Sequence, residues 1–88
     1  VITNAAFTKT QLAKIAGMAH NGYARSIRPV HTTADGDTIY AMSAGEVRAD
    51  INVAGTLAAR VISEAVKRAV LEAGPMYGLK CADDRAAL

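Results

Sequence analysis

The chain has 88 residues, 51% of them hydrophobic, and a formal net charge of +2. This length allows at most one compact unit, near the small end of the range in which a chain can bury its own core. The basic and acidic residues are interspersed, so the sequence predicts no field that would attract nucleic acid or an anionic membrane, and we expect neither as a partner. The single cysteine, Cys81, excludes an internal disulfide and fits a cytoplasmic location.

The chain opens with the predicted end of a β-strand at Val1–Thr3, and a turn is expected at residues 4–6. A helix is then predicted from Thr8 to about Arg28. Thr8 and Gln11 have the spacing of a capping box, in which each side chain accepts a hydrogen bond from the backbone of the other residue. Pro29 ends this helix, because a proline disfavours the helical conformation in the residue before it.

Apolar residues recur at helical spacing along this predicted helix, which indicates one buried face. Gly17 and Gly22 lie inside it, where each should cost roughly 0.5–1 kcal/mol relative to alanine. We therefore expect another segment to lie so close to each glycine that a larger side chain would not fit. The apolar face consists of Leu12, Ile15, Ala16, Ala19, Tyr23 and Ile27.

Residues 29–36 are predicted to form a loop, Thr38–Ser43 a second strand, and residues 44–51 a polar connection. Both faces of this strand are apolar, which predicts that it lies inside a layered sandwich and not on a sheet with one wet face. The side chains that alternate between the two faces are Ile39, Tyr40, Ala41 and Met42.

A second helix is predicted at about Asn52–Ala73, with a wide apolar stripe along one side. Gly74 and Pro75 end it in the usual order. Residues 75–88 have no periodicity and are predicted to form an irregular tail. The stripe consists of Ala54, Leu57, Ala58, Val61, Ile62, Ala65, Ala69 and Val70.

These elements predict an α+β fold in one unit that spans residues 1–88, in the order strand, helix, strand, helix. Two strands alone cannot form an independently stable sheet or cover two amphipathic helices. We therefore expect another segment or chain to complete the sheet. A strand at the first residue, without an initiator methionine, also indicates that the chain was cut from a longer one.

Asp35-Gly36-Asp37 is the one conspicuous polar cluster, at the entrance to the second predicted strand. Alternation would put the two carboxylates on the same side if the strand extends that far. Two nearby carboxylates can split their pKa values, orient an amine or accept protons. The simpler interpretation of the residues alone is an ordinary Asp-Gly turn.

His20 falls on the flank of the first helix and His31 in the following loop. Neither has a second ligand or a nucleophile at a recognisable spacing. The pattern therefore favours capping, packing or solvated histidines over a general base. We expect no metal and no cofactor.

One long segment carries a family resemblance: Met18-Ala19-His20-Asn21-Gly22-Tyr23-Ala24-Arg25-Ser26-Ile27-Arg28-Pro29-Val30-His31-Thr32, continued by Asp35-Gly36-Asp37-Thr38-Ile39-Tyr40-Ala41. It resembles the small C-terminal chain of the N-terminal-nucleophile hydrolases that include the L-aminopeptidase/D-esterases and the endo-acting nylon-oligomer hydrolases. The resemblance extends over most of the chain, up to about Gly74.

The resemblance implies a four-layer αββα sandwich and a precursor that cuts itself into a large and a small chain, exposing a serine or threonine nucleophile. Family spacing puts that residue about five positions before Val1, where its own amine can serve as the base. The family's acidic positions match Asp35 and Asp37, which we predict to be catalytic. The implied partners are the large chain of the same precursor, further copies of the heterodimer, and a peptide or small amide substrate.

The first acidic position is typically a serine in the aminopeptidase branch of the family, whereas this chain has Asp35. The difference favours the nylon-oligomer-hydrolase branch and leaves amide hydrolysis intact. Two alternatives stay open, a catalytically inactive structural or assembly module of the same fold and a small regulatory α+β binding domain. The upstream sequence discriminates between the enzyme and the inactive module, because only the enzyme needs a serine or threonine at the expected distance.

Overall fold

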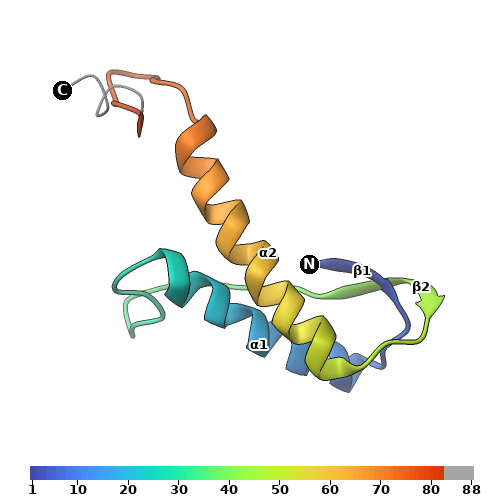
Figure 1. Ribbon diagram of the computed structural model, residues 1–88. Coiled ribbons are helices and arrows are strands. Elements are labelled where there is room, and N and C mark those ends of the chain that lie inside the picture. Colours follow the sequence, from blue (N-terminus) through green and yellow to red (C-terminus); the bar gives the residue numbers. More distant parts are fainter. Residues whose placement is uncertain (83–88) are drawn as a thin grey trace.

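The computed structural model describes residues 1–82, which form two strands and two helices (Figure 1). In chain order these are β1 (Ile2–Ala5), α1 (Lys9–Ser26), β2 (Met42–Val47) and α2 (Ile51–Glu72). The predicted α+β class and element order are confirmed. Within the predicted tail, Met76 and Leu79 form an isolated antiparallel bridge, and residues 83–88 lie outside the described part. Neither helix of residues 1–82 is long and apolar enough to cross a membrane.

Helix α1 begins where the sequence predicts and ends two residues before the predicted end at Arg28. The Thr8 amide donates to Gln11 Oε1 at 2.9 Å, and the Gln11 amide donates to Thr8 Oγ1 at 3.2 Å. This reciprocal pair confirms the capping box, which satisfies amides that have no partner within the helix. At the other end, the Ile27 amide donates to the Tyr23 carbonyl at 2.8 Å, and the helix stops at Ser26.

Helix α2 begins slightly earlier than predicted because Asp50 caps it. Asp50 Oδ1 accepts hydrogen bonds from the amides of Asn52 at 2.8 Å and Val53 at 3.2 Å. A carboxylate at this position satisfies unpaired amides and interacts favourably with the helix dipole. The sequence pattern assigns Asp50 to the polar connection and does not reveal this cap. The helix ends at Glu72, in agreement with the predicted stop at Gly74.

The two strands form a parallel sheet with Ile2 paired with Met42. The predicted bounds of the second strand, Thr38–Ser43, are wrong, since β2 begins at Met42 and continues to Val47. Residues belong to a ladder only where a neighbouring strand faces them. Before Met42, the Tyr40 carbonyl still accepts a hydrogen bond from the Val1 nitrogen at 2.7 Å, but β2 itself begins at Met42.

The turn predicted at residues 4–6 is also wrong, because β1 continues to Ala5. The pairing shifts register within β1, as at a bulge. Gly45 of β2 lies against this irregularity, and a Cβ there would collide with the carbonyl oxygen of Asn4. The strands therefore approach closely at a position where only glycine fits.

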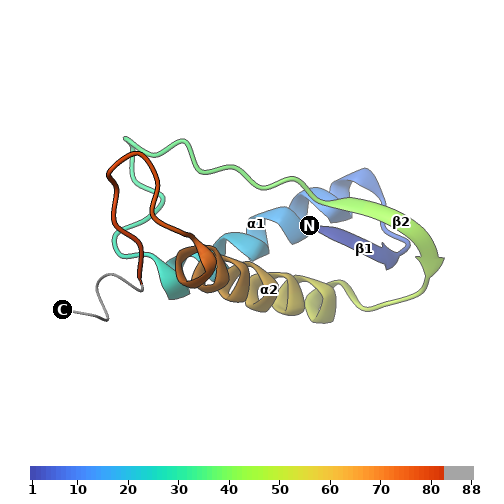
Figure 2. The same ribbon diagram turned by 90° about the horizontal axis from the view of Figure 1, so that it is seen from above.

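Helices α1 and α2 pack against each other and on the same side of the strand pair, as predicted (Figure 2). The buried centre consists of Ile15 and Ala19 from α1 and Ala58 from α2. Because two of these three side chains are methyl groups, the helices can approach closely. Partly buried apolar residues from the strands and their flanks close the centre: Val1, Phe7, Ile39 and Ala41.

Gly22 marks a close approach between the two helices. A Cβ at this position would collide with the Ala59 carbonyl oxygen and lie 2.8 Å from Ile62 Cβ. The expected close neighbour is therefore confirmed for Gly22. For Gly17 the expectation is wrong, because nothing lies within 4 Å of a Cβ built there.

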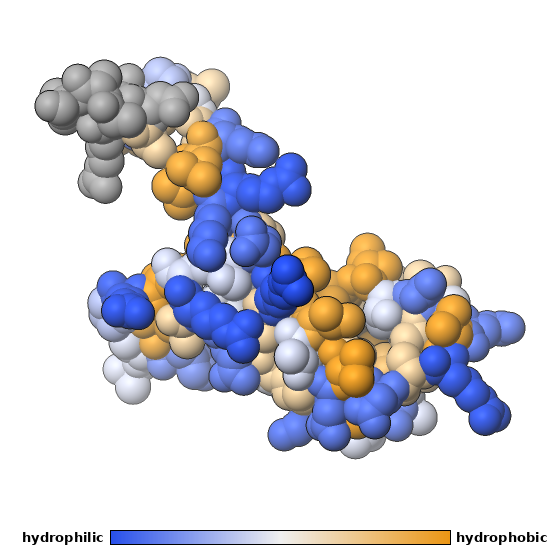
Figure 3. All heavy atoms as spheres, in the orientation of Figure 1, coloured by the Kyte–Doolittle hydropathy of each residue, from blue (hydrophilic) through white to orange (hydrophobic). Residues whose placement is uncertain are grey.

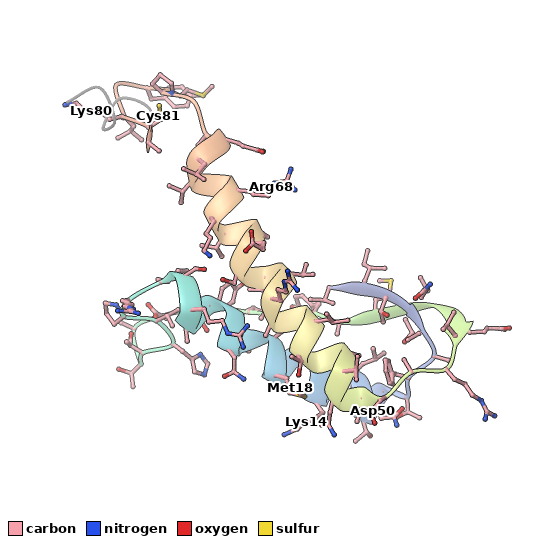
Figure 4. The ribbon with its side chains drawn as sticks, in the orientation of Figure 1. Lys14, Met18, Asp50, Arg68, Lys80 and Cys81 are labelled. Carbon is pink, nitrogen blue, oxygen red and sulfur yellow. The ribbon has the colours of Figure 1, made fainter. Side chains whose placement is uncertain are left out.

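Two further contacts join the helices. Met18 of α1 lies against Gly55 near the start of α2 (Figure 4). Farther along, the hydroxyls of Ser26 and Ser63 are 2.7 Å apart, and the Ser26 hydroxyl also lies 3.1 Å from the Ser63 carbonyl oxygen. Because Ser63 is only 6% exposed, this pair satisfies a buried polar group that would otherwise destabilise the interface.

Gly22→Ala is expected to lower stability by about 1–3 kcal/mol, because the added methyl meets a backbone carbonyl that cannot move aside. The matched control is Gly17→Ala, which should be neutral or raise stability by up to ~1 kcal/mol through helix propensity. Denaturant unfolding of both variants measures the difference. Equal effects at the two positions would contradict the packing described for Gly22.

Two apolar surfaces of the described residues remain uncovered. We call them the outer sheet face and the α2 face. The side chains of the outer sheet face are 58% to 83% exposed: Ile2, Tyr40 and Met42. The α2 face borders a cavity of about 250 Å³ between α2 and β1, and Figure 3 shows apolar atoms gathered where α2 passes the strands. Its side chains are Val53, Leu57 and Val61.

Candidate functional site

The loop at residues 27–41 joins α1 to β2 and carries the predicted polar cluster. It folds back onto α1, where the Tyr23 hydroxyl donates to the Thr38 carbonyl at 3.4 Å. Within the loop, the Thr32 amide donates to Asp35 Oδ2 at 3.0 Å, and the Asp35 amide donates to the Thr32 carbonyl at 3.1 Å. Asp35 therefore closes a turn with both its side chain and its backbone.

This turn brings Asp37 against two histidines. His31 Nδ1 lies 2.6 Å from Asp37 Oδ2, and His20 Nδ1 lies 3.2 Å from the same oxygen. His20 comes from α1, whereas His31 comes from the loop, in a left-handed conformation with φ of 58°. The two imidazole rings are 4.9 Å apart, with 41° between their planes. These three side chains form the His20–His31–Asp37 cluster.

The short contact between His31 and Asp37 determines which ring nitrogen of His31 carries a proton. An ionised carboxylate can only accept, so His31 Nδ1 must carry the hydrogen and donate it. This hydrogen bond lowers the pKa of Asp37 from its ordinary value, and the charges of His31 and His20 lower it further, while partial burial opposes the shift. Asp37 is therefore a carboxylate throughout the neutral pH range.

The contact of His20 with the carboxylate is close but not aligned. His20 Nδ1 is buried and has no hydrogen-bond partner of good geometry among residues 1–82, although Asp37 Oδ2 is only 3.2 Å away. The ring of Tyr23 stands edge-on to His20, with 5.6 Å between their centres. The position of His20 is thus fixed by its helix and by this aromatic neighbour.

The sequence offered neither histidine a ligand or a nucleophile at a recognisable spacing, but in the fold both face Asp37. The two aspartates occupy different settings, since Asp35 closes the turn and Asp37 joins the cluster. The two histidines are the residues of the cluster that sequence reasoning missed, because their contact with Asp37 depends on how the loop returns onto α1. The predicted catalytic role of Asp35 and Asp37 stays a prediction.

Comparison with known proteins gives a family for almost the whole chain. Residues 1–83 match the model described as Peptidase family S58. An uncharacterized aminopeptidase of Mycobacterium tuberculosis is 33% identical over 94 residues, which cover 90% of this chain and 27% of that protein. A 6-aminohexanoate-oligomer endohydrolase of Agromyces sp. is 32% identical over 83 residues, which cover 84% of this chain and 23% of that protein.

No solved structure shows a significant match to this chain. The chain spans about a quarter of the length of the curated relatives it matches. The family match nevertheless includes both helices, both strands and the loop with the His20–His31–Asp37 cluster. The resemblance identified from the sequence is therefore confirmed, and the chain belongs to peptidase family S58.

Proposed function

We propose that this chain is the small chain of a self-processing amide hydrolase, in which a serine or threonine upstream of Val1 becomes the N-terminal nucleophile. Membership of family S58 supports hydrolysis of amide bonds. Two relatives, named as an aminopeptidase and as an oligomer endohydrolase, agree with it. The observation that carries the proposal is the register of the sheet.

The parallel ladder continues to the first residue of the chain. The ammonium nitrogen of Val1 donates to the Tyr40 carbonyl at 2.7 Å, and the Met42 amide donates to the Val1 carbonyl at 2.9 Å. Val1 thus makes the evenly spaced bonds of a parallel pair, next to the pairing of Ile2 with Met42. An upstream residue in the same register would run beside the stretch that precedes Tyr40.

If the parallel pairing of Ile2 with Met42 continues upstream of Val1, each step before Val1 corresponds to one step back from Ala41. A nucleophile about five residues before Val1 would then lie beside Gly36, where the proposal needs its amine and hydroxyl to be. Gly36 separates Asp35 from Asp37 in the chain. The family spacing and the extrapolated strand register therefore both support a nucleophile beside the Asp35-Gly36-Asp37 motif.

In the proposed reaction, the α-amine takes the hydroxyl proton of the nucleophile as the oxygen attacks the amide carbon. The amine half of the substrate leaves with a proton, and the acyl group stays on the oxygen as an ester. Water then attacks the ester, its proton passes to the α-amine, and release of the acid restores the hydroxyl. Asp37 would accept a hydrogen bond from the ammonium or hydroxyl, and Asp35 would hold the turn that places Asp37.

The proposed substrate is a peptide or a small amide, and the proposed partner is the large chain of the same precursor. Asp35, where the aminopeptidase branch typically has serine, favours an oligoamide substrate. The outer sheet face suits a second sheet packed upon it, because face-to-face sheets bury alternate apolar side chains. The large chain would supply that sheet and most of the substrate pocket, and heterodimers would associate further.

Self-processing predicts two chains from one precursor. When the polypeptide is expressed with its complete upstream sequence, intact mass spectrometry should find a large and a small chain whose masses sum to the precursor plus one water. The small chain should begin with serine or threonine, and alanine at that position should stop the cut. A single uncut chain in the native protein would instead support the inactive assembly module.

A further inference from the structure

We infer that His31 is a positioning residue, assisted by His20. It holds the Asp37 carboxylate by one oxygen, so that the other oxygen is presented to the nucleophile. The inference rests on the function proposed above, because it assigns Asp37 its task. It adds two residues for which the family match and the sequence motif give no role. It also explains why two histidines from separate elements meet at one carboxylate.

The geometry gives the two histidines one common target. Both Nδ1 atoms approach Oδ2 of Asp37, at 2.6 Å and 3.2 Å, which leaves Oδ1 for another partner. The Asp37 side chain is 15% exposed, so part of it stays accessible at the surface of the described residues. A carboxylate that is hydrogen-bonded through one oxygen keeps its orientation, and its other oxygen can still accept a further hydrogen bond.

The backbone of His31 is arranged for the same contact. Its φ of 58° lies in the left-handed region, which is unfavourable for a residue other than glycine. Its side chain is 69% exposed, so packing does not explain this conformation. The hydrogen bond to Asp37 is the contact that the unusual backbone makes possible.

The distances favour this role over a metal site. The donor atoms of His20, His31 and Asp37 all lie within 4.8 Å of one another, which is compatible with a cation. Two ligands bonded to one tetrahedral zinc at about 2.0–2.1 Å are, however, about 3.3 Å apart. The 2.6 Å between His31 Nδ1 and Asp37 Oδ2 is too short for a shared metal and ordinary for a charge-assisted hydrogen bond.

The experiment compares His31→Ala with His31→Asn in the complete self-processed protein. Alanine removes the donor, whereas asparagine keeps an N–H near the position of Nδ1 and tolerates the left-handed conformation. Thr33→Ala, at an exposed position of the same loop, is the control. For His31→Ala we expect kcat to fall roughly 10-fold or more with little change in KM, the factor that a hydrogen bond to a charged group is worth.

The pH profile is the measurement that a merely structural residue would not change. The groups that contact Asp37 are His31 from the loop and His20 from α1. Because the His31 hydrogen bond lowers the pKa of Asp37, its loss raises that pKa, and the acidic limb of the kcat profile should move to higher pH. His31→Asn should recover most of the rate, and His20→Asn should have the smaller effect of an unaligned contact.

The outcomes separate this inference from the function on which it rests. An inactive Asp37→Asn variant together with an unshifted pH profile in His31→Ala would overturn the positioning role and leave the proposed function standing. A fully active Asp37→Asn variant would overturn the positioning role together with the catalytic assignment of Asp37, whereas the proposed hydrolase function fails only if the complete protein neither cuts itself nor hydrolyses amides. A requirement for added zinc in the wild-type protein, lost in His31→Ala, would replace the positioning role with a metal site. Melting temperatures of all variants should stay within a few degrees, since His31 is exposed.

Discussion

Asparagine in place of Asp37 is expected to lower self-cleavage and turnover by ~10²-fold or more, the usual contribution of a positioned acid–base group. The substitution keeps the shape of the side chain and one accepting oxygen, but it removes the negative charge. His31 already holds the carboxylate in its ionised form, so the variant loses the charge that would face the ammonium of the nucleophile. Rates are measured in the precursor and in the processed protein, with melting temperatures alongside.

Asp35→Asn should cause a loss of the same order if Asp35 shares the catalytic task predicted from the sequence. Its amide oxygen can still accept the hydrogen bond from the Thr32 amide, so the turn should survive. A rate loss without a stability loss then reports the missing charge. If Asp35 only closes a solvent-exposed turn, processing and turnover should be near normal.

Asp50→Asn is the matched control for both variants. Asp50 also accepts hydrogen bonds from backbone amides, but it does so at the start of α2. Asparagine caps a helix about as well as aspartate, so stability and rates should both be unchanged. Unchanged rates in all three variants, with unchanged stability, would remove the catalytic assignment of Asp35 and Asp37.

The helices could be predicted from the sequence because their end signals are local. Thr8 and Gln11 are three residues apart, and the reciprocal bonds that they form depend on nothing else in the chain. The strand bounds depend on a partner, and apolar alternation alone does not say which residues face one. Tyr40 and Met42 follow the same alternation, yet β2 begins only at Met42.

The site was predictable in its carboxylates and not in its histidines. Asp35-Gly36-Asp37 is a contiguous motif, so it can be recognised from the sequence without knowing the fold. The distance from His20 to Asp37 depends on how the loop returns onto α1, which is determined by contacts such as the Tyr23 hydroxyl with the Thr38 carbonyl. Such a contact joins residues 15 positions apart and has no sequence pattern of its own.

Residues 1–88 produced alone are expected to associate or precipitate, with an apparent mass well above 9.2 kDa. The outer sheet face and the α2 face leave large apolar side chains in water, and each strand of the two-stranded sheet has an unpaired edge among the described residues. Light scattering gives the mass. A monodisperse monomer with a cooperative thermal transition would contradict the need for a covering chain.

Met42→Lys is expected to weaken association with the large chain by roughly 10²- to 10⁴-fold, because an unpaired charge buried in an interface costs about 3–5 kcal/mol. Met42 is the central residue of the outer sheet face, paired with Ile2 in the ladder and 58% exposed in residues 1–82. Asn21→Lys adds the same charge on the polar side of α1 and should leave assembly intact. Size-exclusion chromatography of the processed protein, with both variants beside the wild type, measures how much of the small chain stays bound. Retention of the Met42→Lys chain at the wild-type level would mean that the outer sheet face is open to solvent in the assembled protein, and the sandwich expected from the family would then need its second sheet elsewhere.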